Sequence, residues 1–200
     1  GFRGGAGGGA AARALGTSLE AETRTLAATQ SERLTGELEI ELTINGTQQR
    51  LTVEPRTTLL DALRWRMQTP LTGTKEVCDR AACGACTVIV DGRTAYACTQ
   101  LAVDFLGREI TTVEGLGQPD NLSPVQQAFC EKDALMCGFC TPGFVVSVTN
   151  TLERQPAADL GAIRAGCAGN VCRCGTYPHI FEAALAARDA KGKTSGGAGR

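Results

Sequence analysis

The sequence predicts an α+β fold in which a strand-rich part comes first and a helical part follows. Three observations lead to this prediction. Apolar and polar residues alternate between positions 38 and 53, the apolar period becomes helical from Leu122 onward, and tight groups of cysteines occur in both parts. Period two is typical of a half-buried strand, and a period near 3.6 is typical of an amphipathic helix. A chain of 200 residues is long enough for one or two small cores.

The strand-rich part begins with a hairpin. Over residues 38–44 the apolar side chains fall on one face and the polar ones on the other, which predicts a half-buried strand. Asn45-Gly46 follows, and this dipeptide is the strongest short hairpin signal. Residues 48–53 then return as the second strand.

A helix and further strands complete the first part. Thr57 or Thr58 can cap a helix over residues 59–67, on which Trp65 is expected to pack at the surface. Three strands are expected after it, over residues 87–90, 94–97 and 109–113. A single helix across a mixed sheet, with a cysteine loop at its edge, is a β-grasp arrangement. We assign residues 37–117 to it.

Cysteines in the first part have the spacing of a binuclear cluster. The pattern is C-x4-C-x2-C followed by a fourth cysteine, formed by Cys78, Cys83, Cys86 and Cys98. This is the plant-type spacing for a [2Fe–2S] cluster. Alanine and glycine fill the loop, so its backbone can approach the sulfurs closely. Zinc usually takes paired C-x2-4-C knuckles, which leaves a structural zinc or disulfide set as the less favoured alternative.

The helical part is expected to be a small four-helix bundle over residues 118–188. Ser123-Pro124 and Thr141-Pro142 each place a capping residue before a proline suited to the first helical position. The second of these helices is expected over 141–154, a third from Asp159 to Ile163 and the last over 178–188. Residues 189–200 are expected to form a disordered tail.

Four more cysteines lie just before two of these helix starts: Cys137 and Cys140 as C-x2-C, and Cys172 and Cys174 as C-x-C. The unpaired N–H groups of a helix start favour thiolate anions, so two such loops facing each other would close a four-thiolate site. Cys130 and Cys167 fall outside the groups and are expected to be small buried hydrophobes. His179 is expected at the surface or in a cap.

Composition excludes other classes of protein. The net charge is −1, no block of like charge stands out, and aromatic residues make up 4% of the chain. Nucleic acid is therefore not an expected partner. No apolar run has the length of about 20 residues that a membrane helix needs, so no transmembrane segment is expected.

Four motifs occur in an order that resembles a known family: Gly73-Thr74-Lys75, Cys83-Gly84-Ala85-Cys86-Thr87-Val88, Cys137-Gly138-Phe139-Cys140-Thr141-Pro142-Gly143, and Gly169-Asn170-Val171-Cys172-Arg173-Cys174. Over residues 37–188 the chain is similar to the two-cluster iron–sulfur subunit, or domain, of the molybdenum hydroxylases. That family includes xanthine dehydrogenase, aldehyde oxidoreductase and carbon monoxide dehydrogenase. The resemblance implies two [2Fe–2S] clusters that carry electrons from a molybdenum–pterin site to a flavin or haem acceptor.

The resemblance also implies partners. A large molybdopterin-binding subunit would oxidise an aldehyde or an N-heterocycle, and an FAD-binding or cytochrome c subunit would take the electrons. Cys174 is implied as the ligand nearest the pterin, and the Cys78 group as the exit. Met136 stands where the family commonly has a glutamine that hydrogen-bonds the pterin, and Cys174-Gly175-Thr176-Tyr177 replaces the commoner C-T-G-Y. No catalytic residue is expected in this chain. A stand-alone two-cluster carrier is the alternative function.

Residues 1–36 differ from the rest of the chain. They are rich in glycine and alanine and then in small polar residues, so we expect a flexible tail. The stretch resembles the segment that follows the arginine pair of a twin-arginine export signal. This predicts a periplasmic protein, with the cytoplasm as the alternative location.

Overall fold

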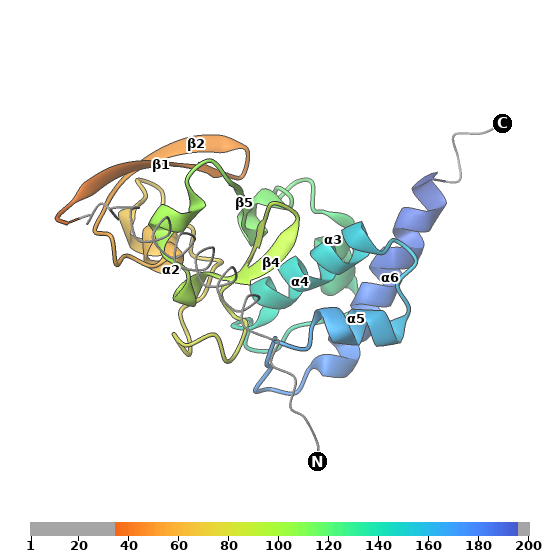
Figure 1. Ribbon diagram of the computed structural model, residues 1–200. Coiled ribbons are helices and arrows are strands. Elements are labelled where there is room, and N and C mark those ends of the chain that lie inside the picture. The colour runs from red at the N-terminus through yellow and green to blue at the C-terminus, as the bar shows by residue number, and fades with distance from the viewer. Residues whose placement is uncertain (1–34, 196–200) are drawn as a thin grey trace, which may run out of the picture. The chain divides into compact units, whose positions relative to one another are not determined.

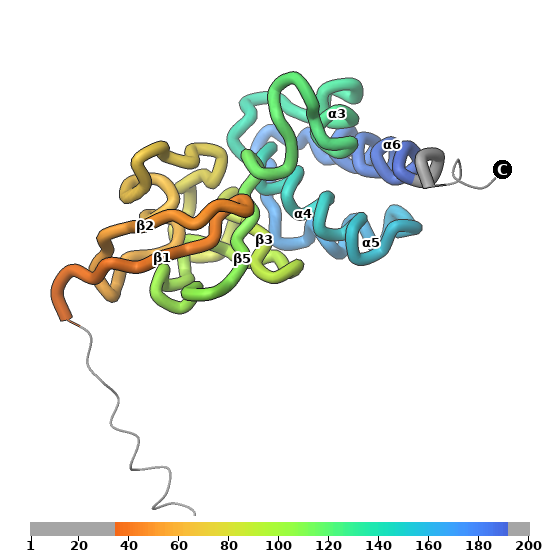
Figure 2. Tube along the Cα trace, turned by 90° about the horizontal axis from the view of Figure 1, so that it is seen from above, coloured from red at the N-terminus to blue at the C-terminus, as the bar shows by residue number. Residues whose placement is uncertain are grey.

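The computed structural model describes residues 35–195, and side chains as far as residue 191. Within this range the chain forms a mixed five-stranded sheet and a set of helices (Figures 1 and 2). The α+β prediction is confirmed at this level. The flexible tail and the export signal expected over 1–36 fall almost wholly outside the described residues.

The sheet is built from two hairpins and one central strand, in the order β2-β1-β5-β3-β4. The first hairpin pairs β1 (Leu38–Ile44) with β2 (Thr47–Val53), and the second pairs β3 (Thr87–Val90) with β4 (Arg93–Tyr96). Strand β5 (Glu109–Thr111) lies between them, parallel to β1 and antiparallel to β3. Figure 2 shows β1, β5 and β3 side by side.

The first hairpin forms as its sequence predicts. Ile40, Leu42 and Ile44 are buried, while Glu39 and Glu41 are exposed. Asn45 and Gly46 take φ angles of 52° and 74°, and both must be left-handed in the turn that matches the strand twist. The Asn45 side chain also accepts a hydrogen bond from the Thr112 N–H (2.8 Å) and so ties the turn to the end of β5.

The helix expected over 59–67 is present but is not a regular α-helix. It begins as α2 (Leu59–Asp61), capped by the Thr58 hydroxyl, and continues as a π-helical segment over Ala62–Arg66. The carbonyl of Leu63 accepts a hydrogen bond from the Leu71 N–H (3.0 Å). The segment after the helix therefore supplies the hydrogen-bond donor for the Leu63 carbonyl, which lies on the wider π-helical turn. Trp65 lies at the surface, as expected.

Strand β5 is shorter than predicted, and strand β4 has the predicted length but begins and ends one residue earlier. Strand β4 ends at Tyr96, and Cys98 lies on the 3₁₀ turn Ala97–Thr99 instead of on a strand. Strand β5 ends at Thr111 and is followed by the 3₁₀ turn Val113–Gly115. A further 3₁₀ turn, Ala102–Phe105, was not expected. Strand β5 meets β3 over just two residue pairs, and this pairing ends at Thr111, where the strand ends.

Four helices follow: α3 (Pro124–Glu131), α4 (Thr141–Arg154), α5 (Leu160–Gly166) and α6 (Tyr177–Ser195). The starts of α3 and α5 agree with the predicted caps, Ser123 and Asp159. The predicted Thr141 cap is wrong: Cys140 is the N-cap of α4, and Thr141 is already its first helical residue. Ser123 and Gln126 bond each other reciprocally in a capping box. Asp159 accepts from the Ala162 N–H (2.8 Å) at the start of α5.

Two of these helices run further than predicted. Helix α5 reaches Gly166, and α6 reaches Ser195, so the expectation of a disordered tail from residue 189 is wrong as far as 195. Ala187 is fully buried, and the Arg188 guanidinium donates to the Ala158 carbonyl (3.1 Å). These contacts anchor α6 where composition alone suggested fraying.

The described residues bury two hydrophobic cores. One lies between the sheet and the α2 region and includes Leu42, Leu59, Leu63, Val88 and Ile110. The other lies among the four helices and includes Phe144, Val148, Leu152, Ile163 and Ile180. Helix α4 packs against β3 and β4 as well as against its neighbouring helices (Figure 1). It is buried from Gly143 to Asn150 and joins the two cores.

None of the helices in the described part of the chain is both long and apolar enough to cross a membrane.

Candidate metal centres

The first four cysteines come together as two pairs. The Cys78 and Cys83 side chains are within hydrogen-bonding reach of each other, and so are those of Cys86 and Cys98. Cys83 and Cys86 are also close enough for their charges to interact. The second pair is buried and the first is partly exposed. The C-x4-C-x2-C loop therefore brings all four predicted thiols to one place.

Backbone N–H groups of this loop point at the sulfurs. Ala81 donates to Cys98 Sγ and Ala82 donates to Cys78 Sγ, each over 3.3 Å. To do this the loop turns left-handed at Asp79, Ala81 and Gly84. A left-handed conformation costs a non-glycine residue about 1–2 kcal/mol. Residues held in such conformations cluster at functional sites.

The environment shifts the pKa values of Cys78 and Cys86 in opposite directions. Burial raises the pKa of Cys78, but hydrogen bonds from the backbone of Arg80 and from the Cys83 side chain outweigh it and bring that pKa to about 7. Burial raises the pKa of Cys86 to about 12, helped by its neighbour Cys98. A buried thiol of this kind is stable as an anion only beside a positive charge, which a bound metal supplies.

The second four cysteines show the same pairing. Cys137 is within hydrogen-bonding reach of Cys174, and Cys140 of Cys172. The two loops thus face each other as the sequence predicted. Cys137 and Cys174 are exposed, while Cys172 is buried. This set therefore opens to the molecular surface on one side.

Helix starts and backbone donors support the second set. Cys140 directly precedes α4. Burial raises the pKa of Cys172, but the backbone N–H groups of Thr176 and Gly175 outweigh it and lower that pKa. The Cys172 N–H donates to the Tyr177 hydroxyl (2.8 Å), and that ring packs edge-on against Phe144 at 5.8 Å. The C-x-C loop is thereby fixed to the helical core.

The donor sets fit a binuclear cluster better than a single ion. A [2Fe–2S] cluster takes four thiolates in total, so two thiolates serve each iron and the ligands come in pairs. A tetrahedral zinc site needs at least three ligands converging on one point. In the described residues no three Cys, His, Asp or Glu side chains converge in that way. Two pairs of thiols with backbone N–H donors meet the demand of one [2Fe–2S] cluster at each site.

The two sites are joined by hydrogen bonds that the sequence pattern does not predict. The Val171 N–H donates to the carbonyl of Cys83 (2.9 Å), and the Asn170 amide donates to the carbonyl of Gly84 (2.9 Å). Both acceptors belong to the first cysteine loop and both donors to the second. The only sequence signal was that Gly169-Asn170-Val171 directly precedes Cys172, inside a motif already singled out for its cysteines.

The two remaining cysteines and the histidine lie outside both four-cysteine sets. Cys167 is 3% exposed, as expected, and burial raises its pKa to about 12. Cys130 is exposed, so its expected burial is wrong. Helix α3 buries Ala128 and Phe129, and Cys130 falls on the opposite face. His179 is exposed at the start of α6, with Nδ1 3.1 Å from the Lys132 carbonyl oxygen.

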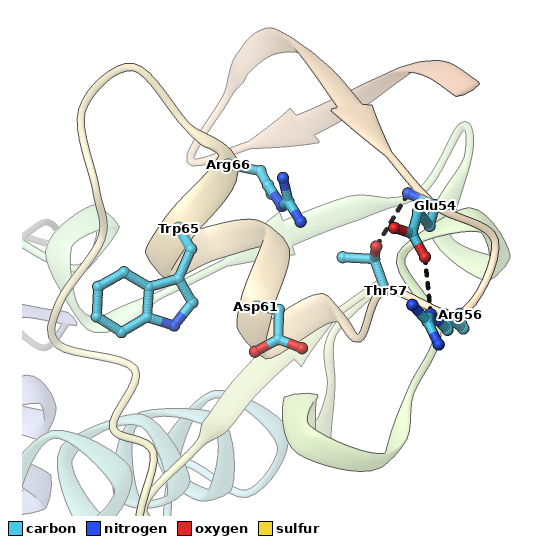
Figure 3. A pocket seen from close by; sticks show the side chains of 6 residues that line it. All are labelled: Glu54, Arg56, Thr57, Asp61, Trp65 and Arg66. Carbon is cyan, nitrogen blue, oxygen red and sulfur yellow. Dashed lines mark hydrogen bonds and ion pairs between the residues drawn. The ribbon is translucent and has the colours of Figure 1, made fainter. Parts of the chain in front are cut away.

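A polar pocket of about 530 Å³ lies away from the cysteines (Figure 3). It is lined by Glu54, Arg56, Thr57, Asp61, Trp65 and Arg66. The Arg56 guanidinium pairs with the Glu54 carboxylate (2.7 Å), and the Thr57 hydroxyl accepts from the Glu54 N–H. The charges of Arg56 and Glu54 therefore offset each other within the lining.

Comparison with known proteins agrees with this geometry. Residues 43–136 match the family model of a 2Fe-2S iron-sulfur cluster binding domain, and residues 112–185 match that of a [2Fe-2S] binding domain. The chain is 46% identical to the aldehyde oxidoreductase iron-sulfur-binding subunit PaoA of Escherichia coli O157:H7, over 71% of this chain and 68% of that protein. It is 42% identical to the nicotine 6-hydroxylase small subunit of Paenarthrobacter nicotinovorans, over 80% of this chain and 94% of that one.

The chain belongs to the iron–sulfur subunits of the molybdenum hydroxylase family.

Solved structures agree with this assignment. The iron–sulfur subunit superimposes with a TM-score of 0.73 on a chain of quinoline 2-oxidoreductase from Pseudomonas putida 86. That chain is 40% identical, and the match covers 78% of the subunit and 97% of the solved chain. Aldehyde oxidoreductase from Desulfovibrio gigas gives the same TM-score at 38% identity, but only 17% of its longer chain is matched. The same fold thus occurs both as a separate chain and as one part of a larger one.

Proposed function

We propose that this subunit conducts electrons from a large molybdopterin-binding subunit, which oxidises an aldehyde or an N-heterocycle, to an FAD-binding or cytochrome c subunit. One observation carries the proposal: eight thiols form two separate sets of four, each set as two pairs. Cys78, Cys83, Cys86 and Cys98 would hold one [2Fe–2S] cluster, and Cys137, Cys140, Cys172 and Cys174 the other. Each bound cluster supplies reversible electron transfer.

The residues around the thiols tune the reduction potential of each cluster. Hydrogen bonds to the sulfurs and exposure to solvent both tune the potential of a cluster. The first set receives N–H groups from Ala81 and Ala82 and has two buried thiols. The second receives N–H groups at Cys172 but exposes Cys137 and Cys174. We infer that the two sites have different potentials because these surroundings differ.

The second set is proposed to face the large subunit, with Met136 and Cys174 nearest the pterin. Exposed apolar side chains accompany its two exposed thiols: Leu135, Met136, Phe139 and Val171. Met136 is 64% exposed and Phe139 is 55% exposed. Apolar side chains around a site that must exchange electrons favour a permanent partner over solvent. Methionine has no hydrogen-bond donor, so its contact with a pterin would be one of packing.

A matched pair of variants tests this surface. Phe139→Glu should weaken co-purification with the large subunit, because it buries a charge in the apolar contact. Leu106→Glu changes an equally exposed apolar residue in the sheet part of the subunit and should leave co-purification intact. Size-exclusion chromatography measures how much of each variant stays in the complex. If both variants stay in it equally, this apolar surface is not the docking face.

The first set is proposed as the exit. Its loop belongs to the part of the chain that also forms the sheet, which we propose to be a β-grasp domain over 37–117, followed by a helical-bundle domain over 118–188. Cys83→Ser in the assembled complex should leave the reduction of molybdenum by substrate intact and stop transfer to the acceptor. If substrate no longer reduced the molybdenum in an otherwise complete assembly, the order of the two sites would be wrong.

Two simpler readings make different predictions. A stand-alone carrier would elute alone from native extracts, without molybdenum. A zinc- or disulfide-stabilised domain would be colourless and free of acid-labile sulfide. The proposed function predicts a coloured chain with two distinct reduced EPR signals that co-elutes with a molybdenum protein.

Export to the periplasm is proposed from the composition of residues 1–30, where glycine, alanine and small polar residues dominate. Cell fractionation with the full-length precursor tests it. Accumulation in the cytoplasm when twin-arginine transport is blocked would support export, and a cytoplasmic location with transport intact would contradict it.

A further inference from the structure

We propose that Asn170 is a positioning residue that holds the two cysteine loops in one fixed arrangement and thereby sets the electronic coupling between the two cluster sites. The inference rests on the proposed function, because it requires that both loops hold clusters. It concerns the contact between the two cysteine loops, which is made by backbone groups and by side chains other than those of the cysteines.

The Asn170 side chain uses its hydrogen-bonding groups on three different segments. Its amide donates to the Gly84 carbonyl (2.9 Å) and to the Thr87 hydroxyl (3.2 Å), and its oxygen accepts from the Ser147 hydroxyl (2.7 Å). Gly84 lies in the first cysteine loop, Thr87 opens β3, and Ser147 lies on α4, the helix that begins after Cys140. Asn170 itself lies in the second cysteine loop and is 6% exposed.

The contact around Asn170 leaves no room for adjustment. A Cβ atom added to Gly84 would lie 2.5 Å from the carbonyl oxygen of Gly169 and 2.7 Å from the Asn170 amide nitrogen. A Cβ added to Gly143 would meet the Gly84 carbonyl oxygen even more closely. Backbone therefore touches backbone between the loops, and a polar side chain in such a buried place must stay bonded.

A short chemical link between the two sites passes beside Asn170. Cys83 belongs to the first set and Cys172 to the second. The carbonyl of Cys83 accepts the N–H of Val171, the residue between Asn170 and Cys172, over 2.9 Å. The two ligands are thus joined by covalent bonds interrupted by a single hydrogen bond. Electron tunnelling weakens steeply with separation, so loosening this joint weakens coupling more than an equal movement elsewhere.

Asn150 provides a matched control. It is a buried asparagine, 4% exposed, and its amide also donates to a glycine carbonyl across the two cores, in this case Gly92 in the β3–β4 turn (2.8 Å). Gly92 belongs to neither cysteine loop. Asn170→Ala and Asn150→Ala therefore remove the same kind of buried bond, but only the first releases the cysteine loops.

The test compares both variants in the assembled complex. The readouts are the magnetic interaction between the two reduced clusters by EPR, the two reduction potentials, and the rate at which the first site is reduced after substrate is added. Asn170→Ala should weaken the magnetic interaction and slow that reduction while both clusters remain. Asn150→Ala should match the native complex in both. Ser147→Ala, which removes only one of the Asn170 bonds, should change them in the same direction by less.

The outcomes separate the inference from the function beneath it. Equal magnetic interaction and equal rates in the Asn170 and Asn150 variants would reduce Asn170 to an ordinary structural residue and overturn the inference, with the function intact. If Asn170→Ala does not assemble, Ser147→Ala decides: an unchanged magnetic interaction there overturns the inference. A native chain without two cluster signals would instead overturn the proposed function.

Discussion

Gly84→Ala tests the closeness of the two cysteine loops directly. Gly84 takes φ +68°, and an added Cβ would lie 2.5 Å from the Gly169 carbonyl oxygen. Two costs follow. A left-handed alanine costs about 1–2 kcal/mol, and forcing a methyl group into a filled space costs about 1–3 kcal/mol more. Replacing glycine also stabilises a protein by about 0.4–1 kcal/mol through the unfolded chain.

Gly107→Ala isolates the steric part of this cost. Gly107 has a similar φ of +71°, and an added Cβ there would meet nothing within 4 Å. Alanine at position 107 has the same cost of a left-handed backbone, and the same stabilisation through the unfolded chain, as alanine at position 84. It lacks only the steric contact with a neighbouring loop. The difference between the two variants should therefore be about 1–3 kcal/mol. For a protein of this size that corresponds to roughly 2–12 °C in melting temperature.

The assay is thermal unfolding of both cluster-loaded variants under anaerobic conditions at one scan rate, since cluster loss makes unfolding irreversible and rate-dependent. Helical circular dichroism and visible absorbance should fall together in each variant. The reasoning would be refuted if Gly84→Ala melted no lower than Gly107→Ala, because the two loops would then have room that the structure does not give them.

Three further predictions concern single side chains. Cys140→Ser should abolish one of the two reduced EPR signals, whereas Cys130→Ser, which alters an exposed cysteine outside both sets, should keep both; loss of a signal in the latter would contradict the ligand assignment. Phe144→Ala empties a fully buried position and should lower the unfolding free energy by about 3–5 kcal/mol, while Phe139→Ala, at an exposed position, should change it by less than about 0.5 kcal/mol. Ser123→Ala removes the capping box of α3 and should cost about 1 kcal/mol; a melting temperature equal to that of the native subunit would show that the cap is not needed.

Local sequence determined those elements whose signals lie within a few residues. The Asn45-Gly46 hairpin and the start of α3 formed as predicted, because the turn and the cap are satisfied by neighbouring groups. The cysteine motifs were also recognisable, because the cysteines within one motif, such as Cys83 and Cys86 or Cys172 and Cys174, are only a few residues apart. Alternation along β1 similarly identified the face that is buried.

Tertiary contacts decided what local patterns could not. The Leu71 N–H takes the carbonyl of Leu63 where a regular helix would have continued, and Arg188 bonds the Ala158 carbonyl and keeps α6 ordered beyond its expected end. In both cases the partner comes from outside the helix. Propensity and periodicity carry no information about such partners.

The contact between the two cysteine loops is the clearest example of a feature that tertiary structure decided. The sequence contains both loops but not the hydrogen bond from Asn170 to Gly84, which links residues 86 positions apart. That contact exists only because α4 packs on β3 and brings the second loop onto the first. The sequence by itself predicted which cysteines act together in each half, since the spacing within each cysteine motif is local. The tertiary structure decided how the two halves meet, since that depends on the packing of two separate cores.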